Sequence, residues 1–254
     1  MAVDVGNTQT VLGLFDEEEP RGHWRIATEV HRTADELAVF CAGLLALEGL
    51  RLEDVSAMIV SSVVPGLTSS YRNLAAEDFG VPFYGVTAEM ETGLDNRYDD
   101  PRAVGADRIV NAVAAGRQYG FPAIIVDIGT ATTVEAVNGE GCYLGGAILT
   151  GLYVSLEALV SRTAKLPSVD LEEKPPRVIA TNTPDSIRSG FIYGYAGAVD
   201  ALIRRSRDEL GEDDVRVVAT GGQAGVIVPY CREIQEFDPD LTLKGLLALY
   251  EMNA

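Results

Sequence analysis

The chain has 254 residues, 47% of them hydrophobic and 23% charged, and its 38 Asp and Glu against 20 Lys and Arg give a formal net charge of −18. This length can bury a core in one large domain or in two ordinary ones. A surface this acidic excludes nucleic acid and anionic membranes as expected partners, because clustered Lys and Arg bind both. A nucleotide stays allowed, since backbone amides, an arginine and metal ions can bind it inside an unfavourable overall field.

Cysteine usage and hydropathy indicate the cellular compartment of the protein. Cys41, Cys142 and Cys231 fit neither a disulfide framework nor a zinc spacing, which predicts reduced thiols. The first residues lack the basic and apolar regions of a secretion signal. The longest apolar stretch, 38–47, is far shorter than the ~20 residues that span a bilayer. We therefore expect a soluble, cytoplasmic protein.

Strands and helices are predicted to alternate along the first half of the chain. Thr33 and Glu36 form a capping box that opens a helix, which stops near Gly49. The other predicted elements are a strand pair over 1–15, strands over 23–28, 55–60 and 82–86, and helices over 67–79 and 101–119, with a polar loop over 89–100.

The second half is predicted to repeat this alternation. Thr183 is expected to be the N-cap of a long helix, with Pro184 at its first position. The remaining predictions are strands over 123–127, 133–137, 142–149 and 215–219, helices over 152–163 and 241–250, and an exposed loop over 170–176. Such alternation predicts an α/β architecture, with one domain over 1–115 and a second over 116–254.

One pattern occurs twice, as DVGNTQTV at 4–11 and DIGTATTV at 127–134. In both copies an aspartate closes an apolar strand, a glycine follows two residues later, and hydroxyl or amide residues precede a second apolar strand. Glycine lets the backbone approach an anion and adopt positive φ, while backbone N–H groups and Thr or Asn side chains donate to phosphate oxygens. The aspartate can hold a cation that touches the phosphate. One copy alone could be an ordinary hairpin turn, but two copies predict a pair of phosphate-binding turns.

The duplicated α/β unit, with a Thr-Gly-Gly at 220–222 after a late strand, resembles the superfamily of acetate and sugar kinases, heat-shock chaperones and actin. More narrowly, the chain is similar from end to end to type III pantothenate kinases. An ordered series of segments carries this resemblance: DVGNTQTV at 4–11, SSVVP at 61–65, GADRIVNAVAA at 105–115, DIGTATT at 127–133, GGAIL at 145–149, SLEAL at 155–159, TAKLP at 163–167, NTPDSIRSG at 182–190, TGG at 220–222 and the terminal PDLTLKGLLALYEMN.

The resemblance implies two ribonuclease H-like (actin-like ATPase) domains with a nucleotide cleft between them. It also implies an ATP-dependent kinase that transfers the γ-phosphoryl group of ATP to the 4′-hydroxyl of pantothenate, the first step of coenzyme A biosynthesis. The implied cofactors are Mg²⁺ with ATP and a monovalent cation, K⁺ or NH4⁺. A homodimer is expected, with the acceptor and potassium sites near the subunit boundary.

The same resemblance assigns roles to residues. Asp107 is the expected catalytic base, and Asp127 the expected ligand of the monovalent cation, while Asp4 faces the magnesium-nucleotide side. The expected pantothenate-binding residues are Tyr98, Gly105, Ala106, Asp107, Arg108 and Thr183. The expected nucleotide-binding residues are Asp4, Val5, Gly6, Asn7, Thr8, Gln9, Thr10, Val11, Thr130, Gly221 and Gly222.

The residues alone leave plainer interpretations open. Asp107 could be a first-turn partner of the helix dipole and Arg108 a surface charge, while Tyr98 could be a packed aromatic. Asp4 and Asp127 could bond only to the amides of their own turns.

Two other functions also stay open at this point. A phosphohydrolase of the same superfamily would use water in place of the alcohol and would not need the segment 105–108. A non-catalytic regulator on the kinase fold is supported only by Thr150, which stands where the family usually has proline; intact Asp4, Asp107 and Asp127 argue against it. The missing proline predicts a looser loop after the preceding strand.

Overall fold

The computed structural model describes all residues, 1–254, and the chain folds as two compact units. Unit 1 comprises Met1–Gly93, Asp99–Arg117 and Leu241–Ala254, and unit 2 comprises Leu94–Tyr98 and Gln118–Asp240. The C-terminal helix therefore belongs with the N-terminal strands. The domain boundary expected after residue 115 stays a prediction.

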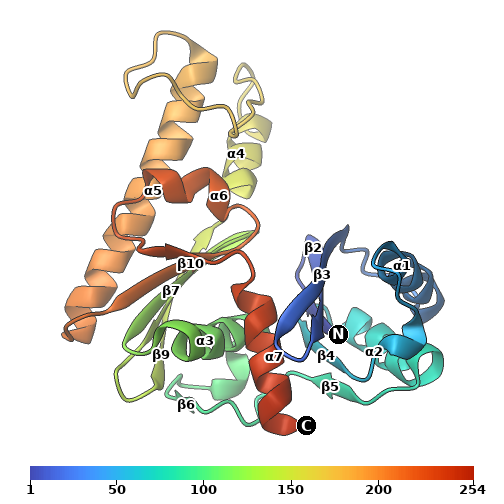
Figure 1. Ribbon diagram of the computed structural model, residues 1–254. Helices are drawn as coiled ribbons and strands as arrows, with labels where there is room; N and C mark the ends of the chain where they lie inside the picture. The colour runs from blue at the N-terminus through green and yellow to red at the C-terminus, as the bar shows by residue number, and fades with distance from the viewer. The chain divides into compact units, whose positions relative to one another are not determined.

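Unit 1 is a five-stranded sheet with helices on both faces (Figure 1). Helices α1 and α2 cover one face, where their apolar side chains pack on Val3, Val5, Leu12 and Leu14. Helix α7 covers the other face, and Leu243 fits against Gly13, where a side chain would collide with it. The elements are β1 (Ala2–Val5), β2 (Gln9–Asp16), β3 (Glu19–Ala27), α1 (Ala34–Leu47), η1 (Leu52–Asp54), β4 (Met58–Ser62), α2 (Pro65–Leu74), η2 (Ala75–Phe79), β5 (Phe83–Gly85), η3 (Pro101–Ala103), α3 (Ala106–Tyr119) and α7 (Leu241–Asn253).

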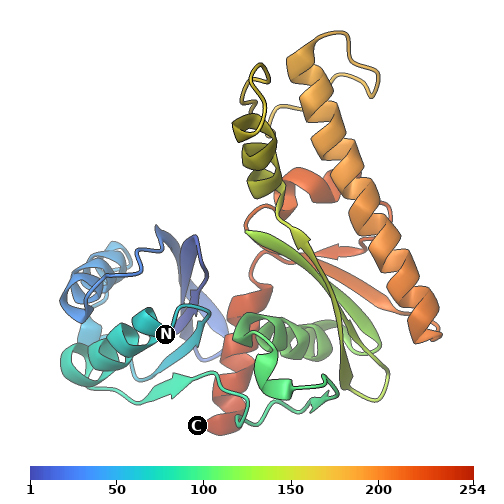
Figure 2. The ribbon, with the colours of Figure 1, turned by 180° about the vertical axis from the view of Figure 1, so that it is seen from behind.

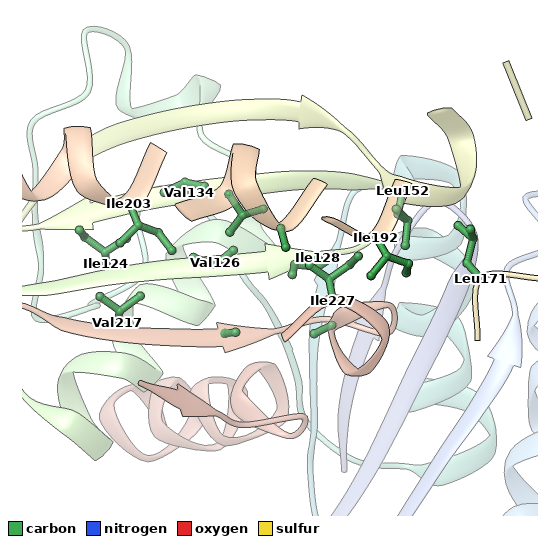
Figure 3. Close-up of a cluster of buried hydrophobic side chains, with 14 of the residues drawn as sticks. Ile124, Val126, Ile128, Val134, Leu152, Leu171, Ile192, Ile203, Val217 and Ile227 are labelled. Atoms are coloured by element: carbon green, nitrogen blue, oxygen red, sulfur yellow. The ribbon is translucent and has the colours of Figure 1, made fainter. Parts of the chain in front are cut away.

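Unit 2 is a six-stranded sheet with its main core on one face. Figure 3 shows Ile124, Val126 and Ile128 of one strand packed against Ile192 and Ile203 of the long helix α5. In both overall views, the N-terminal part of α5 and helix α4 extend together beyond the strands (Figures 1 and 2). The elements are β6 (Asp95–Asn96), β7 (Ala123–Ile128), β8 (Ala131–Val137), β9 (Cys142–Thr150), α4 (Leu152–Ser161), α5 (Thr183–Leu210), β10 (Arg216–Thr220), α6 (Ala224–Ile227), η4 (Val228–Tyr230) and β11 (Glu236–Phe237).

The two sheets share one topology. Unit 1 has the strand order β3-β2-β1-β4-β5, and unit 2 has β9-β8-β7-β10-β11 with β6 added beside β9. In each, the first strand pairs antiparallel with the second and parallel with the fourth, and the fourth pairs parallel with the fifth. This duplicated mixed sheet is the ribonuclease H-like order, so the predicted fold class is confirmed.

Several predicted elements need correction. The helix expected over 101–119 is a short 3-10 turn, η3, followed by α3 from Ala106, with extended backbone at Val104 between them. Asn182, not Thr183, is the N-cap of α5, because its side chain accepts the Asp185 N–H. Thr183 is the first helical residue. The capping box of Thr33 and Glu36 is confirmed.

The segment at Thr150 also differs from expectation. Thr150 is the last residue of β9 and pairs with Ala131, so it extends the strand instead of loosening a loop. Helix α4 starts directly after it, with Gly151 as the N-cap. None of the helices in the chain combines the length and the apolar character that crossing a membrane requires.

Candidate active site

The first predicted phosphate turn connects β1 to β2 in unit 1. Val5 pairs with Thr10, and the Gly6 N–H donates to the Gln9 carbonyl at 3.1 Å. A Cβ on Gly6 would lie 2.9 Å from that carbonyl, so the close approach of the backbone requires glycine here. Gly6 is not among the glycines with positive φ, which corrects that part of the expectation. Asn7, Thr8 and Gln9 are exposed, so their side chains and amides are accessible to a ligand.

Thr28 stabilises this turn through two hydrogen bonds, although no sequence pattern marked it as a site residue. Its hydroxyl donates to the Gly6 carbonyl at 2.8 Å, and its N–H donates to the Thr8 carbonyl at 2.9 Å. The Thr10 hydroxyl lies 2.9 Å from that of Thr28, which leaves Thr10 as the donor of this bond. Thr10 is only 2% exposed. Thr10 therefore helps to fix the shape of the turn through its bond to Thr28, and a contact with a phosphate would be a second role.

The second turn, between β7 and β8 in unit 2, is held in the same way by other residues. The Gly129 N–H donates to the Ala131 carbonyl at 3.0 Å, and the Gly151 N–H donates to the Thr130 carbonyl at 3.0 Å. The Tyr195 hydroxyl of α5 lies within hydrogen-bond distance, 2.8 Å, of both Thr132 Oγ1 and the Thr150 carbonyl. Burial raises the pKa of Tyr195, so its hydroxyl stays protonated as a donor. Thr130 itself is exposed.

The two turns differ by one residue. Between the last strand pairs, Val5 with Thr10 and Ile128 with Thr132, the first turn has four residues and the second has three. The matching backbone bonds align Thr8 with Thr130 and Thr10 with Thr132, which leaves Asn7 as the extra residue. The ungapped alignment of the repeated phrase is therefore shifted by one residue after its glycine.

Asp4 and Asp127 occupy corresponding positions in their sheets. Asp4 pairs with Val11 and Ser61, and Asp127 pairs with Thr133 and Thr220. Each aspartate is half-buried and faces away from the main helix layer of its sheet, because its strand neighbours fill the core. Val5 is fully buried, so it can serve a nucleotide only through its backbone, and Val11 is half-buried in β2.

The Thr-Gly-Gly segment after β10 closes on Asp127. A Cβ on Gly221 would lie 2.4 Å from Asp127 Oδ1 and 2.6 Å from the backbone N of Ile128. Gly221 also has a φ of +101°, which side chains disfavour. The Gln223 N–H donates to the Ile128 carbonyl at 2.9 Å, so the segment is tied to the end of β7. Gly221 thus lies against the Asp127 carboxylate, and Gly222 beside it is exposed.

Asp107 lies in the first turn of α3, in unit 1. Its Oδ1 accepts the Arg108 N–H at 2.9 Å, and a Cβ on Gly105 would lie 2.6 Å from the same oxygen. Gly105, Ala106, Asp107 and Arg108 are all half-buried. The start of α3 therefore holds the carboxylate in one orientation against a glycine that leaves it room.

Helix α7 fixes the position of α3 within unit 1. The Thr242 hydroxyl donates to Asn111 Oδ1 at 2.7 Å, and Asn111 is only 2% exposed. A Cβ on Gly245 would lie 2.2 Å from the Val110 carbonyl, so glycine permits the close crossing of the two helices. The C-terminal segment thus supports the helix that carries Asp107.

Tyr98 and Thr183, the other predicted acceptor residues, both belong to unit 2. Tyr98 is half-buried at the end of the β6 segment, and its ring covers Gly145 of β9. Thr183 lines an apolar hollow of about 510 Å³ between α4 and α5, with Leu159, Phe191 and Tyr195. The structure does not bring Tyr98 and Thr183 together by any described contact.

The donor set suits the two cations that the sequence resemblance implies. Mg²⁺ in nucleotide enzymes takes one or two carboxylates and otherwise phosphate oxygens and waters, and no three His, Cys, Asp or Glu side chains cluster in this chain. The Ser61 hydroxyl, paired in register with Asp4, is fully buried and without a hydrogen-bond partner. A hydroxyl, single carboxylates and exposed turn residues are hard oxygen donors, so these residues fit both Mg²⁺ and a monovalent ion.

The fold and the paired turns define a two-unit protein of the actin-like ATPase class. Solved structures share the fold at low identity. A Baf family protein from Campylobacter jejuni has a TM-score of 0.61 at 17% identity, covering 98% of this chain and 96% of that one. An ethanolamine utilization protein, EutJ, from Carboxydothermus hydrogenoformans has a TM-score of 0.55 at 14% identity, covering 99% and 89%.

Sequence comparison gives the family. A family model described as type III pantothenate kinase matches residues 1–205. Proteins named type III pantothenate kinase are 68% identical over 258 residues in Rubrobacter xylanophilus, covering 100% of this chain and 98% of the relative, and 46% identical over 253 residues in Geotalea uraniireducens, covering 100% and 98%. The chain belongs to the type III pantothenate kinase family, and the prediction of an ATP-dependent pantothenate kinase is confirmed.

Proposed function

We propose that this chain transfers the γ-phosphoryl group of ATP to the 4′-hydroxyl of pantothenate. The observation that carries the proposal is the duplicated turn. In both sheets an aspartate at the same register position precedes a glycine turn with an exposed threonine, and a hydroxyl or amide from a neighbouring segment braces that turn. The exposed residues of each turn, Thr8 in the first and Thr130 in the second among them, offer hydroxyl donors for phosphate oxygens.

Asp107 is the proposed base. Its carboxylate would take the proton from the acceptor hydroxyl while Arg108, next along the helix, holds the far end of the acceptor. The Gly105 position leaves room beside Oδ1, and the bond from the Arg108 N–H fixes the orientation of the carboxylate. Positioning of this kind and charge neutralisation supply most of the rate in phosphoryl transfer.

Asp4 is the proposed carboxylate for Mg²⁺, and Asp127 the proposed ligand for K⁺ or NH4⁺. When bound, these cations supply positive charge that offsets the charge of the phosphates, which an acidic protein cannot do alone. Gly221 keeps the space beside Asp127 Oδ1 free of a side chain. We place the enzyme in the cytoplasm, because its scattered cysteines fit reduced thiols, and we expect a homodimer, because the family resemblance implies one.

The phosphohydrolase alternative requires a water in the place of the alcohol and gives no role to the paired Gly105 and Asp107. The regulator alternative depended on Thr150, which the structure explains as the last residue of a regular strand. Neither alternative is favoured by an observation of its own.

Purified protein incubated with ATP, magnesium and pantothenate should yield phosphorylated pantothenate, detected by mass spectrometry. We expect activity with potassium or ammonium and much less with sodium. ATP loss without phosphorylated pantothenate would support the phosphohydrolase, and equal rates with all three monovalent ions would reject the role of Asp127.

The variant Asp107→Asn tests the proposed base in the same assay. The amide retains an oxygen that can accept the Arg108 N–H, so the start of α3 should persist while the base is lost. We expect kcat to fall by about 10²–10⁴-fold, with nucleotide affinity measured by calorimetry unchanged. Unchanged turnover would remove Asp107 from the role of base.

A further inference from the structure

A buried glutamate and a buried tyrosine form a pair that none of the proposed catalytic steps uses. Glu135 of β8 is 1% exposed and Tyr143 of β9 is fully buried. The Tyr143 hydroxyl donates to Glu135 Oε2 at 2.5 Å. A buried carboxylate is costly unless hydrogen bonds satisfy it. A carboxyl group kept at this depth indicates a structural or functional requirement, and its surroundings suggest which one.

The pair lies on the sheet face that also bears Asp127. Asp127 is directly opposite Thr133, and Glu135 follows two residues later on the same strand. Val137, two residues further, is opposite Tyr143 across a β-bulge. Because alternate residues of a strand share a face, Asp127, Glu135 and Tyr143 project to the same side of the sheet.

The ring of Tyr143 packs beside the ring of Tyr98. The two ring centroids are 6.4 Å apart, at an interplanar angle of 45°. The ring of Tyr98 also lies over Gly145, where a Cβ would lie 3.0 Å from both Cδ2 and Cε2 of Tyr98. Gly145 also has a φ of +103°. The ring of Tyr98 thus occupies a slot that one glycine opens and one buried tyrosine borders.

Hydrogen bonds join the backbone that carries Tyr98 to β9. Strand β6 has only two residues, and its segment joins β9 through the bond from the Arg97 N–H to the Tyr143 carbonyl at 2.9 Å and from the Asp95 N–H to the Gly141 carbonyl at 3.1 Å. The Tyr98 N–H donates to Asn96 Oδ1 at 3.1 Å. Tyr143 therefore contacts this segment twice, through its carbonyl and through its ring.

We propose that Glu135 and Tyr143 are positioning residues of the acceptor site, which hold the ring of Tyr98 where it contacts pantothenate. This inference rests on the proposed function, since it takes Tyr98 as an acceptor contact. Both members are too buried to touch substrate, so they act through Tyr98. The Glu135 carboxylate fixes the Tyr143 hydroxyl, the Tyr143 ring and carbonyl fix the β6 segment, and the segment fixes Tyr98.

The proposal predicts a selective kinetic defect. Tyr143→Phe keeps the ring but removes one donor to the Glu135 carboxylate, which must then move or admit water. The slot would widen, and Tyr98 would sample positions that do not contact the acceptor. We expect the KM for pantothenate to rise about tenfold, with kcat and the KM for ATP within about twofold of the parent.

A second variant and a matched control protect the test against misfolding. The double variant Tyr143→Phe with Glu135→Gln removes the hydroxyl without leaving a charge behind, and should show the same pantothenate defect. Tyr119→Phe is the control, because its hydroxyl also donates to a buried carboxylate, that of Asp238 at 3.1 Å, and Asp238 follows β11 at the opposite edge of the same sheet. It should leave both KM values unchanged.

Hydrogen exchange of the amides of residues 94–98 gives a readout that does not depend on turnover. These amides should exchange several-fold faster in both Tyr143 variants than in the parent or in Tyr119→Phe. If the parent protein makes no phosphorylated pantothenate, the proposed function is wrong. Hydrogen exchange would then still show whether Glu135 and Tyr143 hold Tyr98 in place. Equal exchange, an unchanged pantothenate KM, or a parallel rise of both KM values would overturn the inference.

Discussion

Among the glycines of unit 2 with positive φ, Gly221 has the shortest contacts around its missing Cβ. Its φ of +101° is in a region that side chains rarely adopt, and its missing Cβ leaves room for Asp127 Oδ1 and for the backbone of Ile128. Backbone atoms cannot move aside as a flexible side chain can. Any larger residue must therefore displace the end of β7 or the Asp127 carboxylate, and both belong to the candidate site.

Gly221→Ala tests this constraint. We expect the free energy of unfolding to fall by at least about 1 kcal/mol, because the new side chain combines a strained φ with a steric clash. Nucleotide affinity, measured by calorimetry, should fall as well. Gly225→Ala is the matched control, since that glycine has open space around it and lies in α6. Equal effects of the two substitutions would show that the Asp127 contact is unimportant.

The sequence indicated the candidate binding residues of the turns better than the residues that hold the turns in shape. Asp4, Gly6 and Thr8 follow from a repeated local pattern of turn chemistry. Thr28 and Tyr195 brace the turns from segments 20 or more residues away from the glycines, and no local pattern marks them. The extra residue Asn7 became visible only when strand register aligned the two hairpins.

At the level of elements, the start of α5 separates the helix cap from the residue that is expected to bind pantothenate. Asn182 caps the helix by accepting the Asp185 N–H at 2.9 Å, and its own amide donates to Asp185 Oδ2 at 2.7 Å. Thr183, one residue later, lines the apolar hollow. The sequence placed both roles on Thr183, because Thr followed by Pro is a common helix start.

Substitution of the two residues should give different results. Asn182→Ala should lower the free energy of unfolding by about 1 kcal/mol, as loss of an N-cap does. Thr183→Ala should leave stability within about 0.5 kcal/mol, because it is a surface change, but should raise the KM for pantothenate. Thermal unfolding and steady-state kinetics measure the two effects. A larger stability loss for Thr183→Ala than for Asn182→Ala would contradict the assignment of the cap.

Long elements with clear periodicity were predicted from sequence, and short ones were not. Helices α1 and α5 and strands β7 to β9 have enough residues for their apolar faces to show. Strands β6 and β11 have two residues each, so pairing with a neighbouring strand, which no local pattern reveals, defines them. The break between η3 and α3 was missed because Pro101 resembles an ordinary helix start.

In the whole molecule, five strands of each sheet repeat one topology, but the details differ. These five strands have the same order and the same mixture of parallel and antiparallel pairs in both sheets, and only unit 2 adds a sixth strand, β6. The turn lengths differ by one residue, and the bracing groups are Thr28 in one unit and Gly151 with Tyr195 in the other. The two turns therefore need not present the same donors to a ligand.

The proposed homodimer predicts that a substitution on the exposed face of α5 separates the two subunits. The N-terminal half of α5 leaves Gly190 and Gly194 exposed beside the apolar hollow, which is a surface suited to a second copy. Nothing lies within 4 Å of a Cβ on Gly194, so Gly194→Arg should fold normally but block close packing there. By light scattering, we expect the parent to have twice the chain mass of 27.1 kDa and this variant to have the mass of one chain. Gly43→Arg, at an equally open and exposed glycine of α1, is the matched control and should stay dimeric. A monomeric parent would reject the dimer, and a dimeric Gly194→Arg would place its interface elsewhere.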